Sequence, residues 1–435
     1  MDVEAETVVG PASGTWFRRA EEVMAGGVSS PARSFKAVGG DPPVVMERGD
    51  GAYVVDVDGR TYIDYQAAFG PLVLGHAHPA VVEAVRRQVS RGSLVGATHP
   101  VEVRLAEELT RAIPGLEQLR FVTTGTEAVM SAIRLARAAT GRATVVKFDG
   151  SYHGHSDAML LEAGSGASTV GAKDSAGIPD GVRRDLVTLP YNDTAQVSAF
   201  MASHGHETAC VLVEPVVGNM GLVEPAPDFL ETLRDLTTKT GALLIFDEVI
   251  TAFRFGYGAV GPVLGVIPDL YCLGKIIGGG LPGAAYGGAR ALMAELAPKG
   301  GAYQAGTLAG NPLSSAAGLA TLDVLRRENP YPAMEALGRR LAEGLLEQAA
   351  AFGVAATVNR RGGMFTLFFG DEPVVDYRSA LNTDAERFRR FYQALLRAGI
   401  FLAPSRLECW FVSAVHADRE IVRTLEAAET AWRAL

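Results

Sequence analysis

The chain has 435 residues, of which 48% are hydrophobic and 20% charged, the composition of a globular protein that can bury a large core. Its formal net charge of −9 argues against nucleic acid or an anionic membrane surface as the main partner. No apolar run approaches the roughly 20 residues of a membrane span, and the acidic N-terminus lacks the order of a signal peptide, so we expect a cytoplasmic protein without membrane contact.

Both ends of the chain are expected to contain short secondary-structure elements. Within residues 1–75, the stretch "PPVVMERGDGAYVVDVDGRTYIDYQ" places Gly-Asp and Asp-Gly turns between apolar runs, which predicts a small antiparallel sheet. Residues 326–435 alternate helical stretches such as "DAERFRRFYQALLRAG" with short strands, "GMFTLFF" and "WFVSAV". We expect the N-terminal segment and the C-terminal region to form one smaller α/β domain together.

Residues 76–325 alternate helices with short apolar strands. The expected strands are "QLRFVTT", "ATVVKFDG", "ACVLVEPVVG", "ALLIFDEV", "LYCLGKI" and "GAAYGGA". Nearly all-apolar strands in this alternation predict a large three-layer αβα domain around a mainly parallel sheet. Ligands of such sheets bind beyond the carboxyl ends of the strands, which is where Tyr152, Glu214, Asp247 and Lys275 stand.

The stretch "TTGTEA" lies between an expected strand and an expected helix. The backbone amides of Gly125 and Thr126 would open that helix and, with the helix dipole, form an anion site. An ordinary strand–helix turn explains the stretch equally well. It lacks the three spaced glycines of the dinucleotide fingerprint and the Gly-Lys-Ser/Thr of the P-loop.

Asp247 and Lys275 are charged residues at the ends of apolar runs, where burial costs several kcal/mol unless it is compensated. A buried carboxylate can hold a pyridinium nitrogen protonated, and a buried lysine has a lowered pKa and can form a Schiff base. With a phosphate cradle and the ring of Tyr152, the pair predicts a pyridoxal phosphate site. The alternative is two unrelated surface groups.

A metal site is not expected. "GHAHP" and "YHGHSD" have His-x-His spacing but lie near neither a cysteine nor a Glu-x-x-His helix, so these histidines are interpreted as hydrogen-bonding loop residues. Cys210, Cys272 and Cys409 are far apart and are expected to be buried thiols.

Two loops complete the set of candidate segments. Residues 161–181, rich in Gly, Ser and Ala, form either a flexible connector or a lid over the site. "AYQAGTLAGNP" places Thr307 between glycines before a helix and, taken alone, predicts only a turn.

The order of "TTGTEA", "YHGHSD", "VEPVVGNMG", "FDEVITAFR", "LGKIIGGGLPGAAYGG" and "YQAGTLAGNP" resembles the class III aminotransferase group of fold-type I pyridoxal-phosphate enzymes. Within that group, "SSPARSFK", "AGSGASTVGAKDSAGIP", "EPVVGNMG" and "YQAGT" are similar to glutamate-1-semialdehyde 2,1-aminomutases. The likeness covers nearly the whole chain, from residue 25 to residue 421.

The resemblance implies a role for each matching residue. Lys275 would hold the cofactor aldehyde and move protons, Asp247 would pair with the pyridinium nitrogen, and Val249 and Tyr152 would enclose the ring. The other positions that it implies are phosphate ligands at Gly125, Thr126 and Thr307 of a partner subunit, a substrate-carboxylate site at Ser30 and Arg33, and pocket residues at Phe69, Ser165, Asn219, Gln304 and Glu408.

The implied reaction moves an amino group within one molecule. The pyridoxamine 5′-phosphate form of the enzyme would convert glutamate 1-semialdehyde into 5-aminolevulinate through 4,5-diaminovalerate, a step of tetrapyrrole biosynthesis, in a homodimer with shared active sites. A lid at 161–181 would keep the diamine bound.

Some positions differ from the commonest family pattern. Phe69 stands where many members have tryptophan, and Cys409-Trp410 follows the glutamate where most have Ala-Gly. If Phe69 and Trp410 reshape the pocket, an alternative is an intermolecular aminotransferase acting on a β- or ω-amino acid. A non-catalytic binding protein is a third possibility, against which the retained Asp247 and Lys275 argue.

Overall fold

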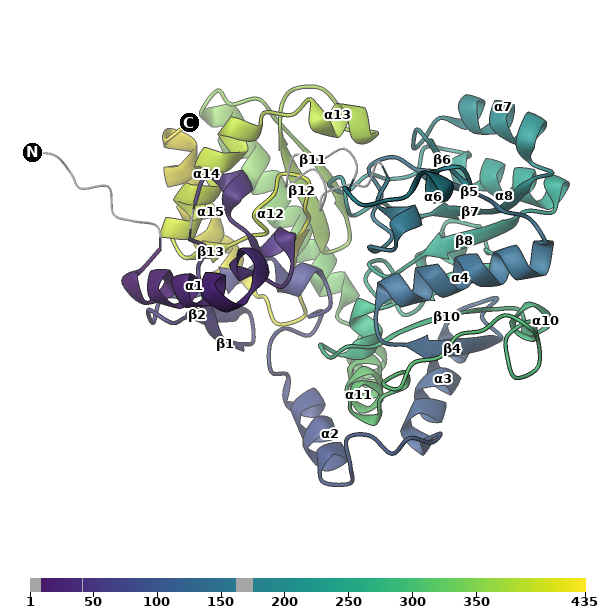
Figure 1. The fold of residues 1–435 in the computed structure, drawn as a ribbon. Helices are drawn as coiled ribbons and strands as arrows, with labels where there is room; N and C mark the ends of the chain where they lie inside the picture. Colours follow the sequence, from purple (N-terminus) through teal and green to yellow (C-terminus); the bar gives the residue numbers. More distant parts are fainter. Residues whose placement is uncertain (1–8, 41, 162–174) are drawn as a thin grey trace, which may run out of the picture.

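The computed structural model describes residues 9–40, 42–161 and 175–435. They form a large α/β domain around one central sheet and a smaller α/β domain built from both ends of the chain (Figure 1). The fold class expected from the sequence is therefore confirmed.

The central sheet of the large domain has seven strands, in the order β4-β10-β9-β8-β7-β5-β6. Strands β5 to β9 run parallel to their neighbours, and β10 is antiparallel to both β4 and β9. Consequently β4 points the same way as the parallel strands, and all of their carboxyl ends meet at one edge. The strands span Gln118–Val122 (β4), Thr144–Phe148 (β5), Leu186–Leu189 (β6), Thr208–Val213 (β7), Leu243–Asp247 (β8), Leu270–Leu273 (β9) and Ala284–Gly288 (β10).

Helices cover both faces of this sheet (Figure 1). In β7, the alternate side chains Cys210 and Leu212 join α4 (Gly125–Thr140) in one core, whereas Val211 and Val213 join α7 (Thr194–His204) and α8 (Phe229–Thr240) in another. Strands that are apolar on both sides are what such a three-layer arrangement requires. All three cysteines are buried and unpaired, as expected.

The smaller domain contains two sheets. Strands β1 (Met46–Asp50), β2 (Tyr53–Asp56) and β3 (Thr61–Asp64) are antiparallel, and β13 (Ile400–Phe401) adds to β3 in parallel. The second sheet is β11-β12-β14 (Ala356–Arg361, Met364–Phe369 and Trp410–Phe411). The β13–β3 pairing and a common apolar core join the N-terminal and C-terminal segments in one unit.

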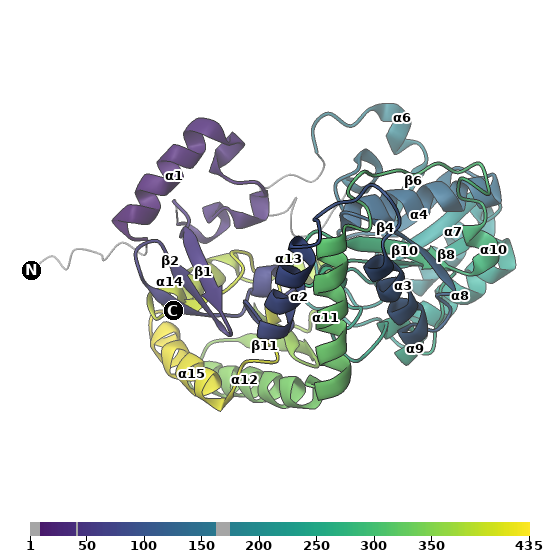
Figure 2. The same ribbon diagram turned by 90° about the horizontal axis from the view of Figure 1, so that it is seen from below.

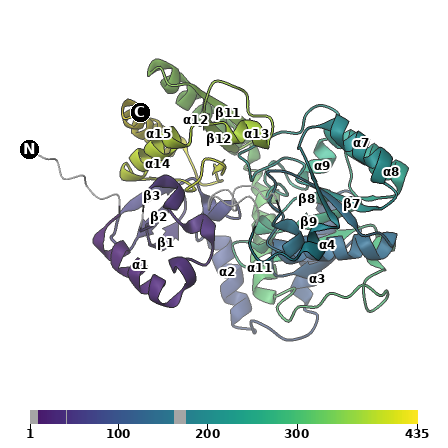
Figure 3. The ribbon, with the colours of Figure 1, turned by 45° about the horizontal axis from the view of Figure 1, so that its top comes forward.

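The smaller domain is enclosed by α1, α12, α14 and α15, with α1 on the outside beside β1 and β2 (Figure 3). Helices α2 and α3 pack against α11, which lies between the domains (Figure 2). The remaining helices are α1 (Pro11–Val23), α2 (Pro79–Val89), α3 (Pro100–Ala112), α6 (Asp180–Arg183), α9 (Val260–Val263), α10 (Arg290–Met293), α11 (Pro312–Glu328), α12 (Tyr331–Ala351), α13 (Tyr377–Leu381), α14 (Ala385–Arg397) and α15 (Asp418–Arg433).

Some details differ from the sequence-based expectation. Helix α1 and strands β6, β11 and β13 were not predicted, and "WFVSAV" is a strand only at Trp410–Phe411. Residues 412–415 leave the sheet because their backbone turns back to the large domain, where the amide of Ala414 donates to the carbonyl of Val73 at 2.8 Å. Within the described residues, no helix combines the length and the apolar character needed to cross a membrane.

Candidate active site

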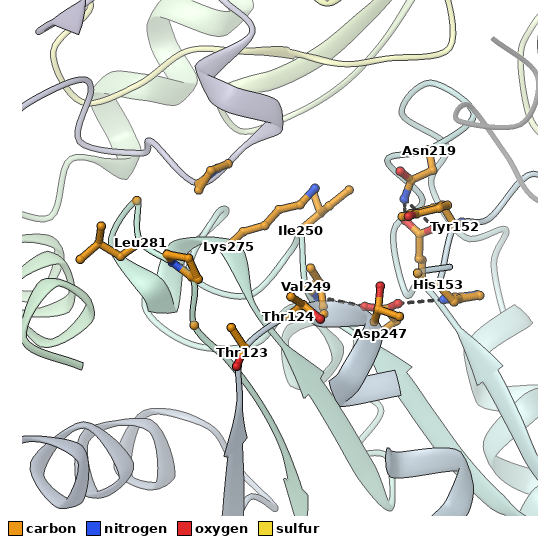
Figure 4. Close-up of a pocket in the computed structure, with 18 residues that line it drawn as sticks. Thr123, Thr124, Tyr152, His153, Asn219, Asp247, Val249, Ile250, Lys275 and Leu281 are labelled. Carbon is orange, nitrogen blue, oxygen red and sulfur yellow. Dashed lines mark hydrogen bonds and ion pairs between the residues drawn. The ribbon is translucent and has the colours of Figure 1, made fainter. Parts of the chain in front are cut away.

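A cavity of about 300 Å³ opens where the carboxyl ends of the central strands meet. Its walls come from the segments that follow β4, β5, β7, β8 and β9. The lining residues are Pro71, Thr123, Thr124, Gly125, Thr126, Tyr152, His153, Gly154, Glu214, Asn219, Asp247, Val249, Ile250, Lys275, Gly280, Leu281, Pro282 and Gly283. In Figure 4, Lys275 enters this cavity from the side opposite Tyr152 and Asn219.

Lys275 follows β9 after one glycine, with a left-handed backbone (φ 48°). Burial lowers the pKa of its amine, while the negative charges of Glu408, Glu214 and Asp247 oppose that shift. An amine whose pKa is lowered is more often uncharged and therefore a better nucleophile and proton acceptor.

Asp247 is the last residue of β8 and is held by two hydrogen bonds. Its Oδ2 lies 2.8 Å from Nδ1 of the buried His153, and its Oδ1 accepts from the backbone amide of Val249 at 3.1 Å (Figure 4). The carboxylate is 5% exposed. His153 therefore fixes the orientation of the acid at the base of the cavity.

Glu214 organises the wall that follows β7. Its carboxylate accepts hydrogen bonds from the amide of Tyr152 (3.0 Å), the amide of Gly218 (3.0 Å) and the side-chain amide of Asn219 (2.9 Å to each oxygen). Burial raises its pKa, against the effect of these donors and of nearby His153. Burial also raises the pKa of the Tyr152 hydroxyl.

The N-terminus of α4 forms the floor of the cavity. Thr124 and Glu127 make a reciprocal capping box, in which the Glu127 carboxylate accepts from the amides of Thr123 (2.7 Å) and Thr124 (2.9 Å). The next two amides, of Gly125 and Thr126, precede the first intrahelical hydrogen bond and are available to an anion. A Cβ on Gly125 would lie 3.2 Å from both Val249 methyls, so glycine lets Val249 approach this floor.

The structure thus brings together seven of the residues predicted from the sequence: Gly125, Thr126, Tyr152, Asn219, Asp247, Val249 and Lys275. Glu408 does not line the cavity, but its charge acts on Lys275.

Other predicted residues lie away from the cavity. Ser30, the exposed Arg33 and the half-buried Phe69 are not among its lining residues. Gln304 accepts a hydrogen bond from Arg120 at 3.3 Å, and Thr307 is exposed, so neither reaches the cavity of its own chain. Ser165, together with most of the predicted lid, lies outside the described residues.

Sequence reasoning interpreted His153 only as a hydrogen-bonding loop residue, and it assigned no role to Glu214 or Glu248. The signal for His153 was its place beside Tyr152 in "YHGHSD", but only the fold shows that it contacts Asp247. Glu248 points away from the cavity and accepts from Thr251 Oγ1 (2.9 Å) and the amides of Val260 (2.7 Å) and Gly261 (2.8 Å). Glu248 therefore orders the loop after β8.

Of the two interpretations of Trp410, a reshaped pocket or compensating packing, the structure favours packing. Trp410 is 4% exposed and packs in the core of the smaller domain, with ring centroids 5.1 Å from Phe365 and 5.7 Å from Tyr65. It does not line the cavity. The unusual tryptophan is accommodated by aromatic packing.

The groups around the cavity match pyridoxal phosphate in their chemistry. Lys275 offers an amine for the aldehyde, Asp247 a buried carboxylate for the ring nitrogen, and α4 two amides for the phosphate. Tyr152 and Val249 supply flat and branched apolar surface for the ring. The residues present therefore fit this cofactor.

Comparison with known proteins identifies the family. A family model described as aminotransferase class-III matches residues 35–425. Among solved structures, the chain is 35% identical to an omega-transaminase from Sphaerobacter thermophilus, with a TM-score of 0.90 and 98% of each chain covered. It is 32% identical to a beta-phenylalanine aminotransferase from Variovorax paradoxus (TM-score 0.85; 97% of this chain and 93% of that one).

A glutamate-1-semialdehyde-aminomutase from Pseudomonas aeruginosa is 28% identical, with a TM-score of 0.85 and coverage of 97% of this chain and 94% of that one. Together with the match over 35–425, these findings show that the chain belongs to the class III aminotransferases, a family of pyridoxal-phosphate enzymes.

Proposed function

We propose that the protein is a glutamate-1-semialdehyde 2,1-aminomutase, which moves an amino group between two carbons of one small molecule. The observation that carries the proposal is the set of carboxylates around the reactive amine. Glu408, Glu214 and Asp247 all act electrostatically on Lys275. A diamine brings a second ammonium that needs a counter-charge, which carboxylates acting at Lys275 can supply.

Lys275, Asp247 and the N-terminus of α4 would have separate roles in this reaction. Bound pyridoxal phosphate supplies an electron sink that lets the amine-bearing carbon release a proton. Lys275 would take up that proton from the carbon on one side of the transferred nitrogen and deliver it to the carbon on the other side, a role that suits an amine whose pKa is lowered by burial. Asp247, oriented by His153, holds the proton on the ring nitrogen, and the amides of Gly125 and Thr126 bind the phosphate.

We assign substrate binding to residues other than those that line the cavity. Arg33, with Ser30, would bind the substrate carboxylate through its guanidinium fork, and Ser165 and Phe69 would close the substrate end. In a homodimer, Gln304 and Thr307 would reach the partner's cavity, where Thr307 would bind the phosphate. Tyr303 and Leu308 in the same segment are large apolar side chains that are 70% and 51% exposed in the single chain, which supports a partner subunit covering this surface.

The second candidate is an intermolecular aminotransferase for a β- or ω-amino acid. The identities of 35% and 32% to an omega-transaminase and a beta-phenylalanine aminotransferase favour it over the 28% to an aminomutase. Against it, the stretches "SSPARSFK" and "YQAGT" are similar to those of glutamate-1-semialdehyde 2,1-aminomutases.

One experiment separates these reactions. The purified protein, loaded with pyridoxamine 5′-phosphate, is mixed with glutamate 1-semialdehyde without any amino donor or acceptor, and 5-aminolevulinate is measured. Many turnovers per site are expected, because each cycle of an aminomutase regenerates the amine form. At most one equivalent, with activity restored by an added amino donor, would instead assign the intermolecular reaction.

A further inference from the structure

The segment between β3 and the cavity contains an unusual turn. Ala67, Ala68, Phe69 and Gly70 are all left-handed, with φ angles of 45°, 53°, 65° and 112°. L-residues avoid this region because the Cβ approaches the following carbonyl oxygen. Three consecutive non-glycine residues in it persist only where the surrounding structure holds them.

Two charged side chains hold this turn, one at each end. At its start, Asp64 Oδ1 accepts from the amides of Gln66 (2.8 Å) and Ala67 (3.1 Å). At its end, Nη2 of Arg254, from the loop after β8, donates to the carbonyl of Gly70. The large domain therefore fixes the last residue of a turn that begins in the smaller domain.

Arg254 is a buried cation for which the described part of the chain shows no ion-pair partner. It is 1% exposed, its Nε and Nη1 have no hydrogen-bond partner among the described residues, and its guanidinium lies 5.1 Å from the ring centroid of Phe411. Burial lowers its pKa to about 10. An apolar side chain of similar size would fill such a site at less cost in stability, so packing alone does not account for arginine here.

The turn lies close to the reactive lysine. A Cβ built on Gly70 would lie 3.7 Å from Cδ of Lys275 and 3.4 Å from the Phe411 ring, and the next residue, Pro71, lines the cavity. A displacement of Gly70 would therefore move the cavity wall beside the stem of Lys275. The positive charge of Arg254 also acts on the amine of Lys275.

We infer that Arg254 is a positioning residue: its guanidinium locks the left-handed turn Ala67–Gly70 against Lys275, and so sets the cavity wall formed by Pro71 beside the stem of Lys275. Only the kinetic test of this inference, the measurement of KM and kcat, rests on the proposed function. The charges of Glu408, Glu214, Asp247 and Arg254 act on the amine of Lys275, and Arg254 is the cation among these four.

The test compares Arg254→Met with a matched control, Arg142→Met, in the cofactor-loaded enzyme. Arg142 also donates to backbone carbonyls, those of Gly205 (3.3 Å) and Thr208 (3.1 Å), but it is not at the cavity. For Arg254→Met we expect KM to rise at least tenfold with kcat within threefold, and a melting temperature equal to or above that of the unaltered protein. The pH midpoint of the bound cofactor's absorbance should move upward, because a positive charge near Lys275 is removed.

Arg254→Lys separates charge from geometry. It should leave the absorbance midpoint in place but raise KM at least threefold, because an ammonium does not reproduce the guanidinium fork; it also serves if Arg254→Met fails to fold. An unchanged KM and midpoint in the Arg254 variants, or changes equal to those of Arg142→Met, would overturn the inference. If the unaltered enzyme turns over neither proposed substrate, the proposed function fails, while the absorbance midpoint and melting temperature still decide this inference.

Discussion

The contact between His153 and Asp247 provides the most specific prediction for the cofactor site. In His153→Leu, the Asp247 carboxylate loses its 2.8 Å partner and keeps only the amide of Val249, at 3.1 Å. A hydrogen bond to a charged group contributes about 1.5–3 kcal/mol. If that stabilisation is lost when the acid must pair with the cofactor ring, the Kd for pyridoxal phosphate should rise about 10- to 150-fold.

The assay is equilibrium dialysis of the apoprotein against pyridoxal phosphate, with free and bound cofactor measured by absorbance. His155→Leu is the control, because His155 lies in the same loop but is exposed, and only its backbone amide contacts the site, through Thr126 Oγ1 at 3.3 Å. His153→Asn should recover part of the affinity, since its amide can donate near the position of Nδ1. A Kd for His153→Leu within threefold of that for His155→Leu would refute the reasoning.

Three further perturbations follow from the structure. Gly154→Ala would place a side chain at a φ of 87°, with its Cβ 2.5 Å from Thr126 Oγ1, so this variant should unfold at a lower denaturant concentration and bind the cofactor more weakly. In the control Gly96→Ala, at a φ of 66° and in open space, only the left-handed backbone is unfavourable, and the free energy of unfolding should fall by about 1–2 kcal/mol. In the apoprotein, burial holds the pKa of Lys275 below its ordinary value of 10.5, so at intermediate pH the lysine binds more protons in the unfolded chain than in the folded one, and the free energy of unfolding rises as pH rises toward 10.5. Lys275→Met should therefore melt at a higher temperature than the unaltered apoprotein at pH 7, and the difference should become smaller as pH rises. A difference in melting temperature that does not change with pH would contradict the lowered pKa. Trp410→Phe should reduce stability by about 1–3 kcal/mol in denaturant titrations, yet leave the distribution of products unchanged, because Trp410 is in the core; a new product distribution would show that it shapes the pocket after all.

The sequence was most informative where local pattern and tertiary environment agree. The apolar runs at β4, β5, β7, β8, β9 and β10 fixed the large sheet, because strands covered on both faces have few polar residues. Strand β6 was missed, since all four of its residues are only half-buried at the edge of the sheet. Strand β13 has two residues, Ile400 and Phe401, and its pairing with β3 spans more than 300 residues of chain, which no local signal records.

The candidate site shows the same division. Lys275, Asp247 and Gly125 carry their chemistry in residue type and in their position at or after the end of a strand, so the sequence could predict that they lie together, and they line one cavity. The role of His153 depends on which side chain faces it, and that of Arg254 on a turn whose last residue is 184 residues away in sequence. Such contacts are consequences of the fold and become visible only with it.

The account depends most directly on Lys275 as the attachment point of pyridoxal phosphate. The decisive measurement is to load the protein with the cofactor, fix it to its lysine by borohydride reduction, digest the protein and map the modified peptide by mass spectrometry. The account predicts modification at Lys275 in stoichiometric amount, and none in Lys275→Met. Modification at another lysine, or an equally modified Lys275→Met protein, would contradict it.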